Sequence, residues 1–172
     1  MPPLIVLWDI DHTLIENSGV SKEIYAAAFT ALAGRAPTEP ALTEGRTDRA
    51  IMMEMFQRQG LMPPPWEETS AALKAAGSGR FEDLRRRGRV LPGAEEALRS
   101  VRSEPGMVSS ILTGNIVGNA RVKLAAFGLD SLVDLTVGAY GGDSTDRSAL
   151  VGIARNRVAA TYDTPPEAPV VW

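Results

Sequence analysis

The chain has 172 residues, of which 44% are hydrophobic, and a formal net charge of −3. This length and composition predict a folded domain with a sizeable core and exclude a disordered or fibrous protein. The slight negative charge provides no basic field for nucleic acid, and the absence of cysteine excludes disulfides, thiolate catalysis and cysteine-based zinc sites.

The N-terminus has no basic segment followed by an apolar stretch of secretory length, because Leu4–Trp8 leads directly into Asp9. No segment approaches the length of a membrane-spanning helix. His12 is the only histidine, so neither a serine triad nor a multi-histidine metal site can be assembled. We therefore expect a cytoplasmic protein that acts on a small molecule, without a nucleic acid or membrane partner. The sequence leaves its oligomeric state open.

Four apolar segments are typical of strands. Leu4–Trp8 is apolar on both alternate faces, which favours a central strand of a parallel sheet that is covered on both sides. Met107–Leu112 and Leu135–Val137 repeat this pattern, and a fourth strand begins at Pro169–Val171.

Helical patterns lie between these strands. One begins after Pro92 and Gly93, a second runs from 116 to 127 and ends at Gly128, and a third covers 144–160. The alternation of strands and helices predicts an α/β fold with a Rossmann-like parallel sheet.

The stretch 17–89 differs, because helical patterns follow one another there without a convincing strand. Ser21 is a candidate N-cap of a first helix, and Thr47 or Asp48 begins a second one that stops at Gly60. Two short helices are expected at 66–76 and 80–87. We predict an all-helical cap domain at 17–89, inserted into an α/β core made of residues 1–16 and 90–172.

Two acidic residues, Asp9 and Asp11, follow the first predicted strand. Ligands gather at the carboxyl ends of parallel strands, so these side chains and Thr113, which ends another strand, can reach one crevice. Neighbouring carboxylates repel each other unless something uses their charge, and Mg²⁺ prefers such oxygen ligands. An isolated Asp-x-Asp pair would more simply cap a strand end or begin a turn.

This pair is not isolated, since Thr13 follows it and Thr113, Gly114 and Asn115 end another apolar strand. The constellation resembles the haloacid dehalogenase-like superfamily of phosphohydrolases, whose first motif is Asp-x-Asp-x-Thr and whose second is an apolar strand ending in Thr or Ser. The predicted helical cap stands where members similar to phosphoglycolate phosphatase carry one.

The resemblance implies a role for each matching residue. Asp9 would form an aspartyl-phosphate, and Asp11 would protonate the leaving group and then activate water. Asp9 and the backbone carbonyl of Asp11 would hold Mg²⁺. The hydroxyl of Thr113 and the backbone amides near Gly114 and Asn115 would bind the phosphoryl oxygens, and a small phosphorylated metabolite would be the substrate.

Arg147 is the best match to the superfamily's third motif, a cation that is usually lysine and stands before or at the start of a helix. It would bind the phosphoryl group in a fork. The alternative is a solvated arginine paired with Asp143 or Asp146. In the cap, the segment containing Arg46 and Thr47 is similar to a loop that contacts substrate in relatives.

The superfamily's fourth motif, an acidic loop after the next strand, is not found, because the sequence given stops at Trp172. We expect a longer parent protein with the remaining Mg²⁺ ligands, and weak activity of the chain as given. Two alternatives stay open: a phosphomutase that uses the same two aspartates, and a non-catalytic phosphate-binding module.

Overall fold

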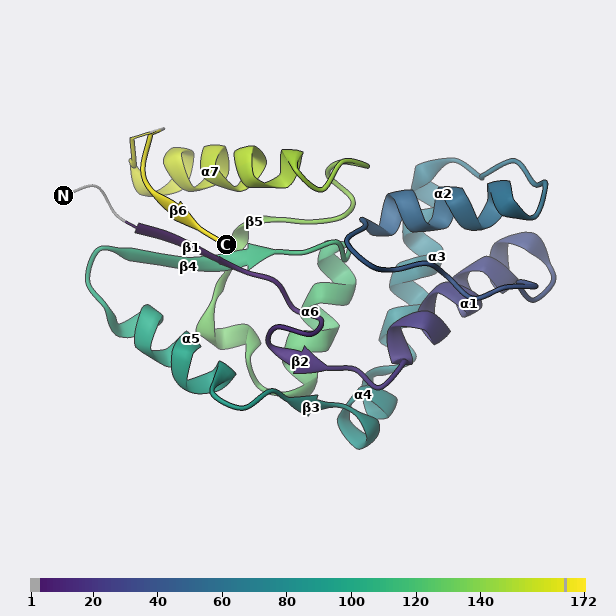
Figure 1. Ribbon diagram of the computed structural model, residues 1–172, viewed down its shortest axis with the longest axis horizontal. Coiled ribbons are helices and arrows are strands. Elements are labelled where there is room, and N and C mark those ends of the chain that lie inside the picture. The colour runs from purple at the N-terminus through teal and green to yellow at the C-terminus, as the bar shows by residue number, and fades with distance from the viewer. Residues whose placement is uncertain (1–3, 166) are drawn as a thin grey trace.

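The computed structural model describes residues 4–165 and 167–172. Its centre is a four-stranded parallel sheet in the order β5-β4-β1-β6 (Figure 1). The strands are β1 (Leu4–Trp8), β4 (Met107–Leu112), β5 (Asp134–Ala139) and β6 (Val170–Val171). All four predicted strands are therefore present, and the α/β class with a Rossmann-like core is confirmed.

Helices cover both faces of this sheet, which explains why the strands carry apolar residues on both faces. Ile5 and Leu7 of β1 pack in one cluster with Leu150 and Ala154 of α7 (Ala149–Tyr162). The other face is covered by α5 (Ala94–Ser103), α6 (Val117–Ala126) and the short 3-10 helix η1 (Asp130–Leu132). In Figure 1, α7 lies above the sheet, and α5 and α6 lie below it.

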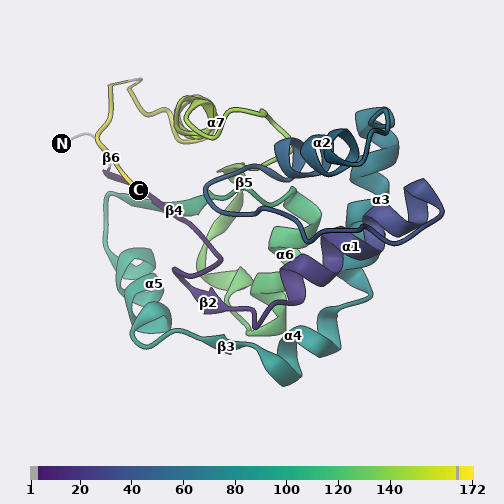
Figure 2. The same ribbon diagram turned by 45° about the vertical axis from the view of Figure 1, so that its right-hand side comes forward.

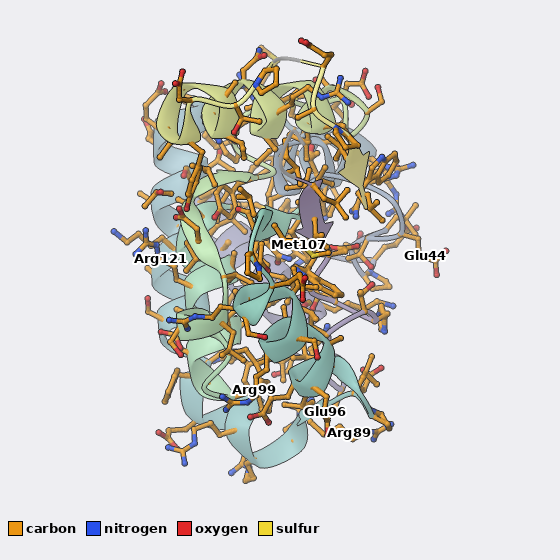
Figure 3. All side chains as sticks on the ribbon, turned by 90° about the vertical axis from the view of Figure 1, so that its left-hand side faces the viewer. Glu44, Arg89, Glu96, Arg99, Met107 and Arg121 are labelled. Carbon is orange, nitrogen blue, oxygen red and sulfur yellow. The ribbon has the colours of Figure 1, made fainter. Side chains whose placement is uncertain are left out.

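The outer surface of α5 illustrates the amphipathic pattern that holds it there. Leu98 is fully buried, whereas Glu96 and Arg99 point outward (Figure 3).

Among the described residues, no helix is long and apolar enough to serve as a transmembrane span.

The stretch predicted as a cap contains only helices among its longer elements. They are α1 (Val20–Ala33), α2 (Asp48–Arg58), α3 (Trp66–Ser78) and α4 (Phe81–Arg87). These helices share a hydrophobic cluster that includes Phe29, Phe56 and Leu73, and Ile116 at the start of α6 belongs to the same cluster. Figure 2 shows the four helices gathered at one end of the sheet, beside α6.

Two chain segments connect the sheet with these helices, and they lie side by side. The short strands β2 (Ile15–Glu16) and β3 (Arg89–Val90) form an antiparallel pair. Next to it, the Ser18 hydroxyl donates a 2.8 Å hydrogen bond to the carbonyl oxygen of Arg87. The connections are therefore adjacent at the predicted boundaries, while the division into two domains remains a prediction.

Two helix starts differ from those predicted. Gly19, with φ of 83°, is the N-cap of α1, and Ser21 lies inside the helix. The predicted helix 144–160 begins only at Ala149, because the Asp146 carboxylate accepts hydrogen bonds from the backbone and hydroxyl of Ser148 and holds a turn there. Arg147 consequently lies in a loop that leads back toward the sheet.

Candidate active site

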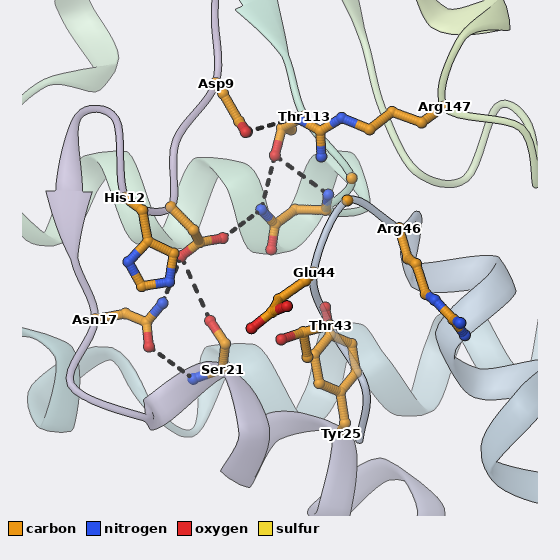
Figure 4. A pocket seen from close by; sticks show the side chains of 14 residues that line it. Asp9, His12, Asn17, Ser21, Tyr25, Thr43, Glu44, Arg46, Thr113 and Arg147 are labelled. Carbon is orange, nitrogen blue, oxygen red and sulfur yellow. Dashed lines mark hydrogen bonds and ion pairs between the residues drawn. The ribbon is translucent and has the colours of Figure 1, made fainter. Parts of the chain in front are cut away.

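A pocket of about 390 Å³ lies where β1 and β4 end, between the sheet on one side and α1 and the segment before α2 on the other. Asp9 directly follows β1 and Thr113 directly follows β4, and both line this pocket (Figure 4). The predicted convergence of these two residues is confirmed. The complete lining is Asp9, Asp11, His12, Asn17, Ser21, Tyr25, Thr43, Glu44, Gly45, Arg46, Thr113, Gly114, Asn115 and Arg147.

The Asp9 carboxylate faces the pocket and has two partners. Its Oδ1 accepts a 2.8 Å hydrogen bond from the backbone N–H of Ile10, and its Oδ2 accepts a 2.5 Å bond from Nη2 of Arg147. The alternative partners considered for Arg147 are occupied elsewhere, since Asp143 pairs with Arg157 and Asp146 bonds to Ser148. The loop before α7 thus brings a cation to the predicted nucleophile.

The Asp11 carboxylate lies deeper and is held by several donors. Oδ1 accepts hydrogen bonds from Asn17 at 2.7 Å and Lys123 at 2.9 Å, and Oδ2 accepts bonds from Lys123 at 2.7 Å and Asn115 at 2.8 Å. Burial by itself would raise the pKa of Asp11, but the positive charge of Lys123 and these hydrogen bonds lower it below its ordinary value. Asp11 is therefore ionised at neutral pH in the free protein.

Lys123 is a residue of the site that the sequence did not single out. It belongs to α6, is 1% exposed, and also donates 2.7 Å hydrogen bonds to the Ser21 hydroxyl and to Oδ1 of Asn115. The sequence did contain a signal for it. Lys123 lies on the apolar face of the predicted amphipathic helix, three residues after Ala120 and next to Leu124, both of which are buried. A lysine in that position requires a buried partner, but the sequence does not identify which one.

The loop of Thr113, Gly114 and Asn115 is closely packed. The Thr113 hydroxyl accepts a 2.8 Å hydrogen bond from Nδ2 of Asn115, which also binds Asp11. A Cβ atom on Gly114 would collide with the carbonyl oxygen of Arg46, so only glycine fits between this loop and the segment before α2. The predicted phosphate-binding loop thus lies against the predicted cap.

The segment before α2 is fixed to this loop by Asp48. Its backbone N–H donates a 2.7 Å bond to the carbonyl oxygen of Gly114, while its carboxylate accepts bonds from Ile116 N–H at 2.8 Å and the Tyr25 hydroxyl at 2.6 Å. Burial, as the largest cause, raises the pKa of Asp48 to about 6. Asp48 is a second residue whose role became visible only in the fold.

The two predicted cap contacts occupy different positions. Arg46 lines the pocket, but its guanidinium pairs with Glu54 of α2. Thr47 is fully buried, accepts a bond from Ala50 N–H as the N-cap of α2, and donates to the carbonyl oxygen of Thr145 at 3.3 Å. Thr47 is therefore not brought to the pocket surface, which differs from the expected substrate contact.

Magnesium was predicted to bind Asp9 and Asp11. Within the described parts of the chain, no group of three or more histidine or acidic residues could hold a metal ion. Mg²⁺ nevertheless often uses only one or two carboxylates, together with water and substrate phosphate. The Asp9 carboxylate and the backbone carbonyl of Asp11 fit such a sparse set of oxygen ligands.

A family model described as haloacid dehalogenase-like hydrolase matches residues 6–169. Among solved structures, CbbY from Rhodobacter sphaeroides in complex with phosphate is similar, with a TM-score of 0.69 and 17% identity over 99% of this chain and 76% of that one. A hydrolase from Pseudomonas syringae has a TM-score of 0.60 and 19% identity, over 92% of this chain and 71% of that chain.

A predicted phosphoglycolate phosphatase from Haemophilus somnus 129PT aligns with a TM-score of 0.49 and 17% identity, over 77% of this chain. The chain spans only 60% of that protein, which is less than two thirds of its length. No curated protein matches the sequence. Because the family model covers nearly all of the sequence, the chain belongs to the haloacid dehalogenase-like hydrolases.

Proposed function

We propose that the protein is a magnesium-dependent phosphatase that hydrolyses a small phosphorylated metabolite through an aspartyl-phosphate intermediate. The observation that carries this proposal is the convergence of Asp9, Asp11, Thr113 and Arg147 on one pocket at the carboxyl edge of a parallel sheet. The similar CbbY structure, which is a complex with phosphate, supports the same reaction class.

In the first step, a carboxylate oxygen of Asp9 attacks the phosphorus of the ester, and the bond from phosphorus to the alcohol oxygen breaks. Arg147, already bonded to Asp9, would neutralise the phosphoryl oxygens. The Thr113 hydroxyl and the backbone N–H groups of Gly114 and Asn115 would donate to the same oxygens. In the free protein the Asn115 N–H donates a 3.3 Å hydrogen bond to the Thr113 hydroxyl oxygen, so it would change its acceptor when the phosphoryl group binds.

The departing alcohol oxygen takes its proton from Asp11. Asp11 must therefore carry a proton in the substrate complex, although Lys123 lowers its pKa in the free protein. The arrival of a phosphate dianion favours that protonation, since a nearby negative charge raises the pKa of a carboxyl group. Binding of the phosphate group would thus raise the pKa of Asp11 and favour the protonated form that donates to the leaving group.

In the second step, Asp11, now a carboxylate, takes a proton from a water molecule, whose oxygen attacks the phosphorus of the aspartyl-phosphate. The bond between Asp9 and phosphorus breaks, which releases inorganic phosphate and restores the Asp9 carboxylate. When bound to Asp9 and the Asp11 carbonyl, Mg²⁺ would offset the repulsion between the carboxylates and the phosphate.

The test is hydrolysis of p-nitrophenyl phosphate by the purified chain, with Mg²⁺ and with excess chelator. Slow but Mg²⁺-dependent release of nitrophenol is expected, because the described residues offer few carboxylate ligands. Asp9→Asn should abolish it, since the amide is not a nucleophile for this reaction. Phosphate binding without any turnover would favour the non-catalytic module instead.

A further inference from the structure

The pocket has two chemically different ends. Asp9, Thr113 and Arg147 form the phosphoryl end, where the strands stop. The opposite end is lined from the helical side by Ser21 and by the segment that includes Thr43 and Glu44. The part of the substrate that does not react must lie at this second end, so its lining decides which alcohol portion is accepted.

The cations of the pocket are already engaged by carboxylates. Arg147 binds Asp9, and Lys123, behind the lining, binds Asp11. Arg46 pairs with Glu54 and extends away from the interior of the pocket in Figure 4. Among the described lining residues, no arginine or lysine is left to receive a second anionic group of a substrate.

The second end instead offers groups that accept hydrogen bonds. Within the described chain, the side chains of Thr43 and Glu44 form no hydrogen bond or ion pair, and both residues line the pocket together with Ser21 (Figure 4). Glu44 is exposed and extends from the edge of the molecule (Figure 3). Its negative charge attracts a cation at the pocket mouth and repels an anion.

We propose that the preferred substrate is the phosphate ester of an amino alcohol, whose ammonium group lies near Glu44 and Thr43. Esters with a hydroxyl group in that position should be accepted less well, and esters with a carboxylate should be disfavoured. This inference rests on the proposed phosphatase function and adds the chemical class of the alcohol. It also distinguishes this chain from an enzyme that selects phosphoglycolate.

Three esters of nearly equal size separate these cases: O-phosphoethanolamine, 2-hydroxyethyl phosphate and 2-phosphoglycolate. They differ in the charge at the end remote from phosphorus, which is positive, neutral or negative. Binding is measured by calorimetry with Asp9→Asn, which cannot form the aspartyl-phosphate, so the result does not depend on turnover. We expect roughly tenfold tighter binding of the ammonium ester than of the carboxylate ester, as for an exposed charge pair.

Two further substitutions, each added to Asp9→Asn, test the residues. Glu44→Gln should reduce the preference for the ammonium ester to roughly twofold, because it removes the attracting charge. Glu54→Gln should improve binding of 2-phosphoglycolate, because it releases Arg46 from its partner. Glu96→Gln on α5 makes the same change of charge outside the pocket and should alter neither ratio.

The inference is overturned by equal affinities, by tighter binding of 2-phosphoglycolate, by no detectable binding of any ester, or by an unchanged ratio in the Glu44→Gln protein. Its failure can be separated from failure of the proposed function by hydrolysis of p-nitrophenyl phosphate in the protein with Asp9 intact. That substrate has no charged group at the remote end and reports only the phosphoryl chemistry.

Discussion

The ammonium nitrogen of Lys123 lies 2.9 Å from Oδ1 and 2.7 Å from Oδ2 of Asp11, so a single buried cation contacts both oxygens of one carboxylate. Lys123 comes from α6, and Asp11 comes from the chain just after β1. The contact therefore fixes the proposed acid of the first step to a helix that packs beneath the sheet. Lys123 lies behind Asp11 and does not line the pocket, so it can position the Asp11 carboxylate but does not contact the substrate.

Replacement of Lys123 by Met should destabilise the protein and slow the reaction. Removing one partner of a buried ion pair typically costs about 3 kcal/mol, which urea unfolding would measure. Because Asp11 acts on the leaving group, turnover of alkyl phosphates should fall more than turnover of p-nitrophenyl phosphate, whose leaving group needs no proton. A purely structural role would reduce both rates equally, and Lys123→Arg should restore part of the difference.

Stability should depend on pH through Asp48. Its pKa is raised from 3.8 to about 6 in the folded protein, so folding favours the protonated form. The stabilising contribution is complete below pH 4 and is lost as pH rises through 6, by about 3 kcal/mol in total. Urea unfolding of the wild type and Asp48→Asn between pH 4 and 7 measures it. As pH rises, the wild type should lose unfolding free energy relative to Asp48→Asn. A difference between the two proteins that does not change with pH would contradict the raised pKa of Asp48.

The parts of this site that could be predicted are those encoded by local patterns. Asp9 and Thr113 each follow an apolar run, and the rule that parallel strands end at one edge is enough to bring them together. Lys123 and Asp48 could not be assigned in that way, because their partners lie 112 and 68 residues away along the chain, at Asp11 and Ile116. Only the packing of α6 and the cap segment against the sheet determines those contacts.

Thr47 and the start of α7 illustrate the same limit on a smaller scale. The pattern correctly indicated a helix start at Thr47, but a side chain that caps a helix is turned away from the pocket. For α7, the helix was predicted from residue 144, although 144–148 contains no apolar residue, and the hydrogen bonds that Ser148 donates to the Asp146 carboxylate hold a turn there, so that the helix begins at Ala149. Local hydrogen bonds between side chains and the backbone therefore determine where both helices begin.

Gly114→Ala should weaken phosphate binding and stability together. The new methyl group would collide with the Arg46 carbonyl and push the cap segment away from the loop of Thr113. Overpacking of this kind costs about 1 to 3 kcal/mol, to be measured by urea unfolding. Gly152→Ala in α7 is the matched control, since no atom lies within 4 Å of its Cβ and the change should stabilise the helix by up to about 1 kcal/mol. Equal effects of the two substitutions would exclude a close approach at Gly114.

Two substitutions of Arg147 test the proposed phosphoryl site: one removes the side chain with its charge, and the other keeps the charge but changes the shape of the cation. Its Nη2 donates to Asp9, so removal of the side chain in Arg147→Ala leaves the carboxylate without this cation and takes away a donor for the phosphoryl oxygens. We expect kcat for p-nitrophenyl phosphate to fall by roughly 10² to 10³, as for loss of one transition-state donor. Arg147→Lys keeps the charge and should retain more activity, although a single ammonium cannot bind two oxygens in a fork. Arg155→Ala on α7, outside the pocket lining, controls for the loss of one positive charge. If Arg147→Ala reduced activity no more than Arg155→Ala, the guanidinium would have no part in the reaction, and its bond to Asp9 would be structural only.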